Sequence, residues 1–299
     1  MPNQTTKHGV IFALAAYVMW GFAPVYFKSL TQVPAYEILA HRVIWSCVFV
    51  AALLGLGKQW GAVSAVIKQP RQLATLALTS VLIGLNWLIF IWAVNNDRML
   101  DASLGYYINP LFNVVLGMLF LGERFRRAQW VAIGLALSGV LIQVISYGSL
   151  PWIAISLAVS FGFYGLLRKK VNLGALPGLF VETLWLFPLA LAYLGLFADS
   201  ATSHLLGNTS SLNILLLSAG IVTTLPLLCF AAAATRLRLS TIGFFQYIGP
   251  SLMFILATSV YGEELEPMKL LTFAFIWLGL SVFTWDALRN QRRQKKAAK

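Results

Sequence analysis

The sequence predicts an all-α polytopic membrane protein with ten transmembrane helices in two inverted five-helix repeats. Of its 299 residues, 59% are hydrophobic and only 11% are charged, and the mean hydropathy is +0.77. Soluble domains carry about 25% charged residues, so this chain has too few charges to cover its surface in water. The apolar runs are continuous rather than alternating, which favours membrane helices over a β-barrel.

Ten apolar runs approach the length of about 20 residues that a helix needs to cross a bilayer. Pro34, Pro151, Pro177 and Pro267 mark the starts of four runs, because proline is tolerated in the first turn of a helix. The runs cover residues 9–27, 35–56, 73–94, 102–121, 128–147, 151–167, 176–197, 212–234, 242–261 and 268–286.

The Lys and Arg residues fall mainly on one side of this ten-helix arrangement. Eighteen of the 22 lie in alternate loops and in the two terminal segments, whereas Lys28, Arg98 and Lys269 lie in the opposite loops and Arg42 lies inside a run. Because cytoplasmic loops are enriched in Lys and Arg, both termini are predicted to be cytoplasmic. The net charge of +12 is therefore explained by the Lys and Arg residues on the cytoplasmic side of the lipid bilayer. Nucleic acid is not an expected partner.

The second half of the chain repeats the first. Gly122-Glu123 matches Gly262-Glu263 and Gly139 matches Gly279, all at an offset of 140 residues. The halves run over residues 1–147 and 148–299, and the second half includes the basic cytoplasmic tail. Because each half has five runs, an odd number, the second half must enter the membrane from the opposite side. Inverted repeats are typical of secondary transporters.

Charged groups inside the runs mark the expected site, because ionisable residues in a membrane helix usually face a cavity or a partner. His41 and Arg42 lie deep in the second run, and Glu37 is one turn before His41, close enough to pair with it. Glu182 occupies the position that corresponds to His41 in the second half. We expect Arg42 to bind an anionic or strongly polar group of a substrate, with Glu182, His41 or Glu37 as proton-coupling groups.

Uncharged polar and aromatic residues extend this expected substrate-binding site. Tyr106 and Asn109 share one helical face, and Pro110 follows them in the same run. The further substrate-binding residues are Asn86, Gln246, Tyr247 and Trp20. The alternative for all of these is ordinary interhelical packing and hydrogen bonding. Glu123 and Glu263 are expected to cap the helices that follow them.

The duplicated Gly-Glu hairpins and the glycines Gly134, Gly139 and Gly279 resemble the EamA-like repeat of the drug/metabolite transporter superfamily. Four further segments resemble its RarD-type members, which are named for chloramphenicol sensitivity: residues 17–27 (YVMWGFAPVYF), 37–45 (EILAHRVIW), 86–96 (NWLIFIWAVNN) and 102–110 (ASLGYYINP). The resemblance covers essentially the whole chain. It implies a permease of the bacterial inner membrane that moves a small organic metabolite or drug, without specifying which one.

Several other functions are not indicated by the sequence. The chain has no Gly-x-x-x-x-Gly-Lys-Ser/Thr loop for ATP, and its Cys, His and acidic residues lack metal-ligand spacing, so we expect no cofactor and no metal. The main prediction is a secondary transporter that works by alternating access, with proton coupling left open, and not an enzyme. A passive channel, a non-transporting membrane scaffold and an intramembrane enzyme stay as alternatives. Self-association into a homo-oligomer also stays open.

Overall fold

The computed structural model describes residues 4–121, 126–148, 150–171, 173–234, 236–237 and 245–297, and its regular structure there is helical. The helices are α1 (Gln4–Lys28), α2 (Ala35–Leu56), α3 (Trp60–Ile67), α4 (Pro70–Asn95), α5 (Met99–Leu121), α6 (Arg127–Tyr147), α7 (Trp152–Val171), α8 (Ala175–Ala192), α9 (Ser210–Ala234), α11 (Ile248–Ile255) and α12 (Pro267–Ala297). The π-helical segments η1 (Tyr193–Phe197) and η2 (Leu256–Val260) extend α8 and α11.

Eight of the described helices are long and apolar enough to cross a membrane. They overlap eight of the runs expected from the sequence. Two shorter apolar stretches, Trp152–Arg168 in α7 and Ile248–Val260 in α11 and η2, overlap the other two runs. A multi-pass helical membrane protein is therefore confirmed, whereas the count of ten spans stays a prediction.

The short helix α3 was not expected from the sequence, which placed residues 57–72 in a loop between two spans. Val63 and Val66 of α3 are buried, and the Trp60 ring packs edge-on against Phe180 of α8, with the ring centroids 5.1 Å apart. The helix has only eight residues, too few to cross a bilayer. It covers one end of the bundle between α2 and α4.

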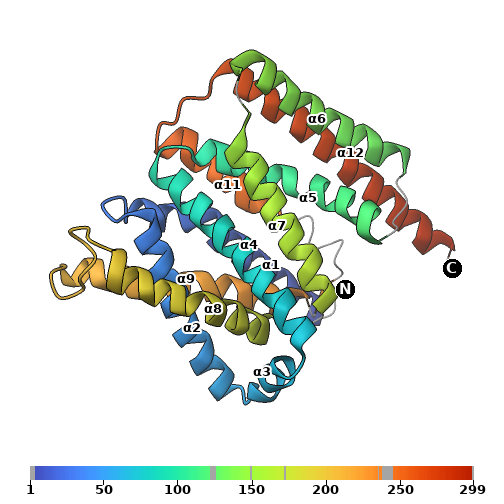
Figure 1. Cartoon of the computed structure of the whole chain (residues 1–299). Coiled ribbons are helices and arrows are strands. Elements are labelled where there is room, and N and C mark those ends of the chain that lie inside the picture. Colours follow the sequence, from blue (N-terminus) through green and yellow to red (C-terminus); the bar gives the residue numbers. More distant parts are fainter. Residues whose placement is uncertain are drawn as a thin grey trace.

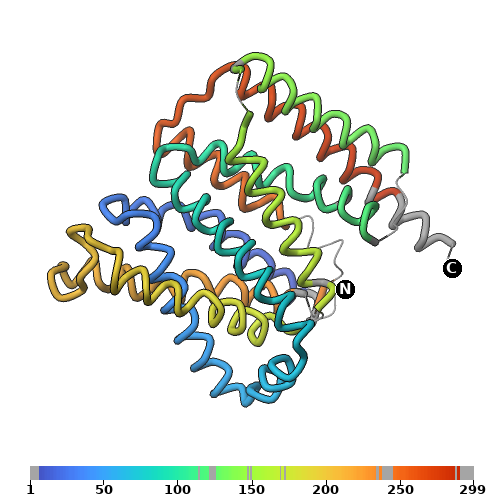
Figure 2. Tube along the Cα trace, viewed as in Figure 1, coloured from blue at the N-terminus to red at the C-terminus, as the bar shows by residue number. Residues whose placement is uncertain are grey.

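The helices form a bundle with one pair set to its side (Figure 1). In the bundle, α1 and α2 pack along α9, α4 and α5 pack along α7, α2 also packs along α8, and α1 packs along α11. The side pair consists of α6 and α12, which lie next to each other along most of their length (Figure 2). Arg126 and Asp286 join this pair at one end through an ion pair of 2.6 Å.

The α6 and α12 helices approach closely at two glycines. A Cβ atom added at Gly279 of α12 would lie 2.8 Å from the Ala132 carbonyl oxygen of α6. The Thr272 hydroxyl of α12 donates a hydrogen bond of 3.2 Å to the Gly139 carbonyl oxygen of α6. The absence of a side chain at Gly279 therefore sets the separation of the two helices.

We expect Gly279→Ala to destabilise the protein by about 2 kcal/mol, because the added methyl group would push α6 and α12 apart. The thermal midpoint of the purified protein in detergent should fall by about 4 to 8 °C. Gly134→Ala is the matched control in α6, since a Cβ atom there meets nothing within 4 Å. An equal change in both variants would contradict the prediction.

Candidate functional site

The guanidinium group of Arg42 is a buried cation about two turns from the start of α2. Arg42 is 9% exposed, and its guanidinium carbon lies 4.2 Å from the ring centroid of Trp87 and 5.5 Å from that of Phe27. Its Nε and Nη1 atoms have no hydrogen-bond partner. Among the described residues, no carboxylate lies within 4.0 Å of its nitrogen atoms. Cation–π contacts offset part of the cost of burial, but they leave these N–H groups able to bind an anion.

Asn86 of α4 holds a polar network next to Trp87. The Asn86 amide nitrogen donates to the Ser160 hydroxyl at 2.9 Å and to the Leu157 carbonyl at 3.1 Å, both on α7. The Tyr106 hydroxyl of α5 donates to the Asn86 amide oxygen at 3.3 Å. The structure thus brings two expected site residues, Asn86 and Tyr106, into contact. The network also fixes the positions of α4, α5 and α7 relative to one another.

Glu182 of α8 is a second buried charged group, with partners from two other helices. It accepts hydrogen bonds from the Thr79 hydroxyl of α4 at 2.7 Å and from the Tyr164 hydroxyl of α7 at 3.2 Å. The Nε atom of Arg168, also on α7, lies 3.5 Å from its carboxylate. The sequence had placed Arg168 in a cytoplasmic loop. Instead, its side chain reaches back into the bundle and is 14% exposed.

A row of aromatic rings connects the surroundings of Arg42 with those of Glu182. The Phe27 ring contacts Phe90 with a centroid distance of 5.7 Å, and Phe90 contacts Tyr106 at 5.8 Å. Tyr106 is followed by Phe161 at 6.3 Å, and Phe161 by Tyr164 at 5.9 Å. The two charged groups therefore belong to one continuous set of side chains in the bundle.

His41 and Glu37 lie on the same helix as Arg42, but the structure does not pair them with each other. The His41 Nδ1 atom accepts a bond of 3.3 Å from the Trp45 indole, and its Nε2 atom has no partner. Glu37 instead accepts a bond of 2.9 Å from the Thr202 hydroxyl in the segment between η1 and α9. No hydrogen bond or ion pair within 4.0 Å joins these two described side chains, and the direct contact of Glu37 is with the second half of the chain.

The other expected site residues lie in separate surroundings. Asn109 is fully buried, and both of its amide atoms lack partners. The Trp20 ring packs edge-on against Tyr17, with centroids 5.3 Å apart. Gln246 is half-buried in the turn before α11, and Tyr247 lines the cavity described below.

One end of the bundle carries the acidic residues Asp97, Asp101 and Glu263, and we call it the acidic end. Ion pairs of these aspartates with Lys28, Arg98 and Lys269 join three segments there. Lys28 at the end of α1 pairs with Asp97 in the turn between α4 and α5. The buried carboxylate of Asp101 pairs with Arg98 at 2.6 Å and with Lys269 of α12 at 3.1 Å. These contacts hold α1, α5 and α12 together at this end.

Glu263 lies at the same end and caps a helix of the other half. Its two carboxylate oxygens accept bonds from the backbone N–H groups of Met99 at 2.7 Å and Leu100 at 2.8 Å. Burial raises the pKa of Glu263, and these two bonds oppose the shift. The sequence had assigned this cap to the helix after Glu263, and the structure corrects it to α5. Glu123 lies outside the described residues.

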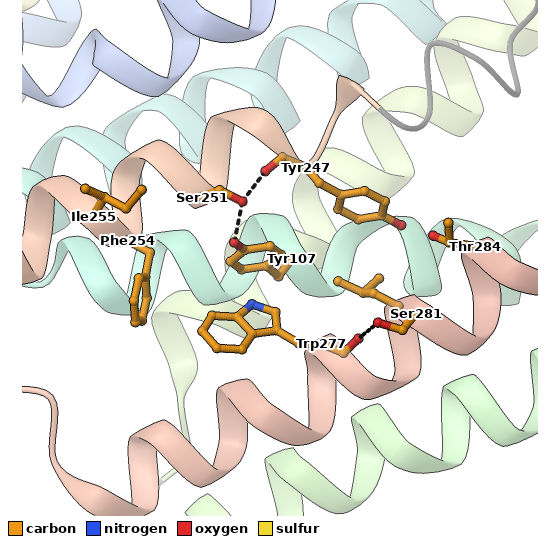
Figure 3. Close-up of a pocket in the computed structure, with 9 residues that line it drawn as sticks. Tyr107, Tyr247, Ser251, Phe254, Ile255, Trp277, Ser281 and Thr284 are labelled. Atoms are coloured by element: carbon orange, nitrogen blue, oxygen red, sulfur yellow. Dashed lines mark hydrogen bonds between the residues drawn. The ribbon is translucent and has the colours of Figure 1, made fainter.

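A cavity of about 480 Å³ lies between α5, α11 and α12. Figure 3 shows Tyr107, Ser251 and Trp277 around it. The Tyr107 and Ser251 hydroxyl groups are 2.7 Å apart, and the Ser251 hydroxyl donates to the Tyr247 carbonyl at 2.7 Å. The sequence named Tyr247 alone of these four residues as a site residue, and it did not predict this cavity.

The partners of Glu182 were not expected from the sequence, although helical spacing places them on shared helix faces. Thr79 lies seven residues before Asn86 in α4, which places both on one face. Phe161, Tyr164 and Arg168 are spaced by three and four residues and share a face of α7.

Comparison with known proteins agrees with this architecture. Residues 7–145 match the EamA-like transporter family. "Protein RarD" of Salmonella typhi is 60% identical over 98% of this chain and 100% of its own length. An "Uncharacterized transporter" of Vibrio cholerae is 57% identical over 99% of this chain and 98% of its own length. A crystal structure with 18% identity shares the fold, with a TM-score of 0.61 over 93% of this chain and 98% of that one. This chain is thus a multi-pass membrane protein that belongs to the EamA-like transporter family, as a RarD-type permease.

Proposed function

We propose that this protein is a secondary transporter that moves a small organic solute with an anionic group, such as a carboxylate, across the bacterial inner membrane by alternating access. The unpaired guanidinium group of Arg42 carries this proposal. A buried charge at the centre of a membrane helix costs about 2.5 to 3.5 kcal/mol on insertion scales. A carboxylate of the solute would compensate the charge of Arg42 and accept a hydrogen bond from one of its unpaired N–H groups.

The proposed architecture has ten spans in two inverted repeats, residues 1–147 and 148–299, with both termini in the cytoplasm. The helix contacts support it when α1, α2, α4, α5 and α6 are matched with α7, α8, α9, α11 and α12. Contacts then occur in equivalent pairs: α1 with α9 and α7 with α4, α1 with α11 and α7 with α5, α2 with α9 and α8 with α4. Two halves related in this way can exchange their arrangements between inward-open and outward-open states.

The glycines of α6 and α12 support the same pairing of halves. A Cβ atom at Gly139 would lie 3.1 Å from the Thr272 carbonyl oxygen, and one at Gly279 would lie 2.8 Å from the Ala132 carbonyl oxygen. Gly139 and Gly279 are 140 residues apart, and so are Ala132 and Thr272. Each residue in one contact therefore corresponds to a residue in the other contact when the two halves of the chain are exchanged.

Alternating access requires that contacts at each end of the bundle separate in turn. At the acidic end, we propose that the Lys28–Asp97 and Asp101–Lys269 ion pairs close the path in the state described here. The Asp97 carboxylate is 74% exposed, so the Lys28–Asp97 ion pair contributes little net stability and suits an end that must open in each cycle. The Asp101 carboxylate is buried, and Arg98, directly before the same helix, stays its partner when Lys269 separates from it.

Proton coupling is assigned in this proposal to Glu182. Its carboxylate is buried in the bundle and connected through the aromatic row to the surroundings of Arg42. Thr79 and Tyr164 can donate hydrogen bonds to it, and Arg168 can compensate its charge. His41 and Glu37 are the alternative coupling groups.

The test is solute counterflow into proteoliposomes that contain the purified protein, with carboxylate solutes compared with their methyl esters. We expect saturable counterflow of a carboxylate solute. Arg42→Gln should raise the solute concentration that gives half-maximal counterflow by at least about thirtyfold, because loss of a buried charged partner costs about 2 to 5 kcal/mol. Arg71→Gln, at an exposed position near the start of α4, should behave as wild type.

Two results would contradict the proposal. If the wild-type protein shows equal counterflow of carboxylate solutes and their methyl esters, Arg42 does not act as an anion-binding group. Flux that does not saturate and shows no counterflow would indicate a passive channel instead of a transporter.

A further inference from the structure

We propose that the cavity between α5, α11 and α12 binds an acyl chain of an anionic phospholipid, with the lipid phosphate at the basic end of α12. The cavity of about 480 Å³ falls within the range of small-molecule sites. Phe254, Trp277 and Leu280 contribute apolar walls to it. This inference concerns a different part of the bundle from the surroundings of Arg42 and does not depend on the proposed transport activity.

The cavity opens toward the outer surface of the bundle. Two of its lining residues, Ile255 and Ser281, are exposed, and Ile255 is exposed to 53%. Ser281 lies in a helix long and apolar enough to cross a membrane, and Ile255 lies in the shorter apolar stretch Ile248–Val260 beside it. The surface around them is therefore expected to face lipid. A lipid chain can therefore enter sideways without leaving the hydrocarbon.

The depth of the cavity matches a single leaflet. The apolar part of α12, Pro267–Asp286, has 20 residues, which corresponds to about 30 Å at 1.5 Å per residue, the thickness of the hydrocarbon core. Trp277 lies at the middle of this stretch and Thr284 near its end. The lining residues of α12 thus extend from the bilayer centre toward the headgroups that border Asp286.

The continuation of α12 past Asp286 carries the positive charge that an anionic headgroup needs. Positions 277, 281, 284, 288, 292 and 295 are spaced by three or four residues and form one stripe along α12. The first three line the cavity, and the last two are Arg292 and Lys295. Arg289 is exposed, and its guanidinium carbon lies 5.1 Å from the Trp285 ring.

The end of the cavity nearer these basic residues carries hydroxyl groups. The hydroxyls of Tyr247 and Thr284 lie there, as Figure 3 shows. These two hydroxyls are hydrogen-bonded to each other, so one of them keeps a proton that it can donate to a lipid ester oxygen. The ester oxygens of a phospholipid lie between the acyl chains and the phosphate. From the bilayer centre outward, the site therefore offers apolar walls, then hydroxyl groups, then basic residues. This is the order of the acyl chain, the ester groups and the phosphate in a phospholipid.

The paired helix α6 lacks these features. Its residues at an offset of 140 from Trp277, Ser281 and Thr284 are Leu137, Leu141 and Val144, and none of them carries a hydroxyl group. The last turn of α6 has no basic residue. The site is thus specific to α12, and Leu141 provides a matched control position for Ser281.

Native mass spectrometry of the purified protein with phosphatidylglycerol or phosphatidylcholine of the same acyl chains tests the proposal. The wild type should retain one phosphatidylglycerol molecule that Ser281→Trp, which fills the cavity, does not retain. Leu141→Trp should retain it. Arg289→Gln with Arg292→Gln should weaken phosphatidylglycerol binding about fivefold per residue, toward the level of phosphatidylcholine.

A second measurement does not rely on filling the cavity. Phosphatidylglycerol with brominated acyl chains should quench Trp277 fluorescence, measured as the difference between the wild type and Trp277→Phe. Equal retention of phosphatidylglycerol by the wild type and Ser281→Trp, equal binding of the two lipids by the wild type, or an unquenched Trp277 would each overturn the proposal.

Discussion

In proteoliposomes, Glu182→Gln is expected to lose solute accumulation driven by a pH gradient and to keep solute exchange at equal pH. A gradient of one pH unit provides 1.4 kcal/mol per proton, which supports about tenfold accumulation if one proton moves with each solute. A glutamine keeps an oxygen that accepts the Thr79 hydrogen bond but cannot take up or release a proton. The accumulation ratio should therefore fall from about ten to about one.

Two matched variants identify which acid carries the proton. Glu37→Gln removes another buried acid of the bundle, and Glu264→Gln removes an exposed acid at the acidic end. Both should keep the dependence on the gradient. If Glu182→Gln keeps it and Glu37→Gln loses it, the coupling group is Glu37. If Glu182→Gln and Glu37→Gln both keep the dependence on the pH gradient, protons do not move through these two acids.

The apolar runs were sufficient to predict most of the long helices, because hydrophobicity over about 20 residues is set locally by the requirements of the bilayer. The helix α3 escaped this criterion. Its eight residues are too few to cross a membrane, and Val63 and Val66 are buried because of packing in the folded bundle. Such a helix is determined by tertiary contacts, which a local pattern does not contain.

The sequence located buried charges better than it located their partners. Arg42 and Glu182 stood out because charges are rare in apolar runs. Arg168 was assigned to a loop because it begins a basic cluster, yet its long side chain reaches Glu182. Glu263 was correctly expected to cap a helix, but the helix is α5 rather than its neighbour in sequence. Which N-terminus lies beside a carboxylate depends on the arrangement of the two halves.

Gly220→Ala is expected to lower stability by about 3 kcal/mol or more, the upper range for overpacking. The two helices α2 and α9 cross at this glycine, where an added Cβ atom would lie 2.4 Å from the Trp45 carbonyl oxygen and 2.9 Å from the Ser46 nitrogen. Both are backbone atoms, so a rotamer change cannot relieve the contact and α2 itself must move. The thermal midpoint of the purified protein should fall by about 10 °C.

This displacement also affects the proposed site, because Arg42 lies less than one helical turn before Trp45 on the same helix. Solute affinity should therefore fall in Gly220→Ala even below its unfolding temperature. Gly165→Ala in α7 is the control, since a Cβ atom there meets nothing within 4 Å and alanine favours the helix by about 1 kcal/mol. Its midpoint should stay equal or rise. If both variants keep the wild-type midpoint, α2 and α9 are not held together by close backbone contact at Gly220.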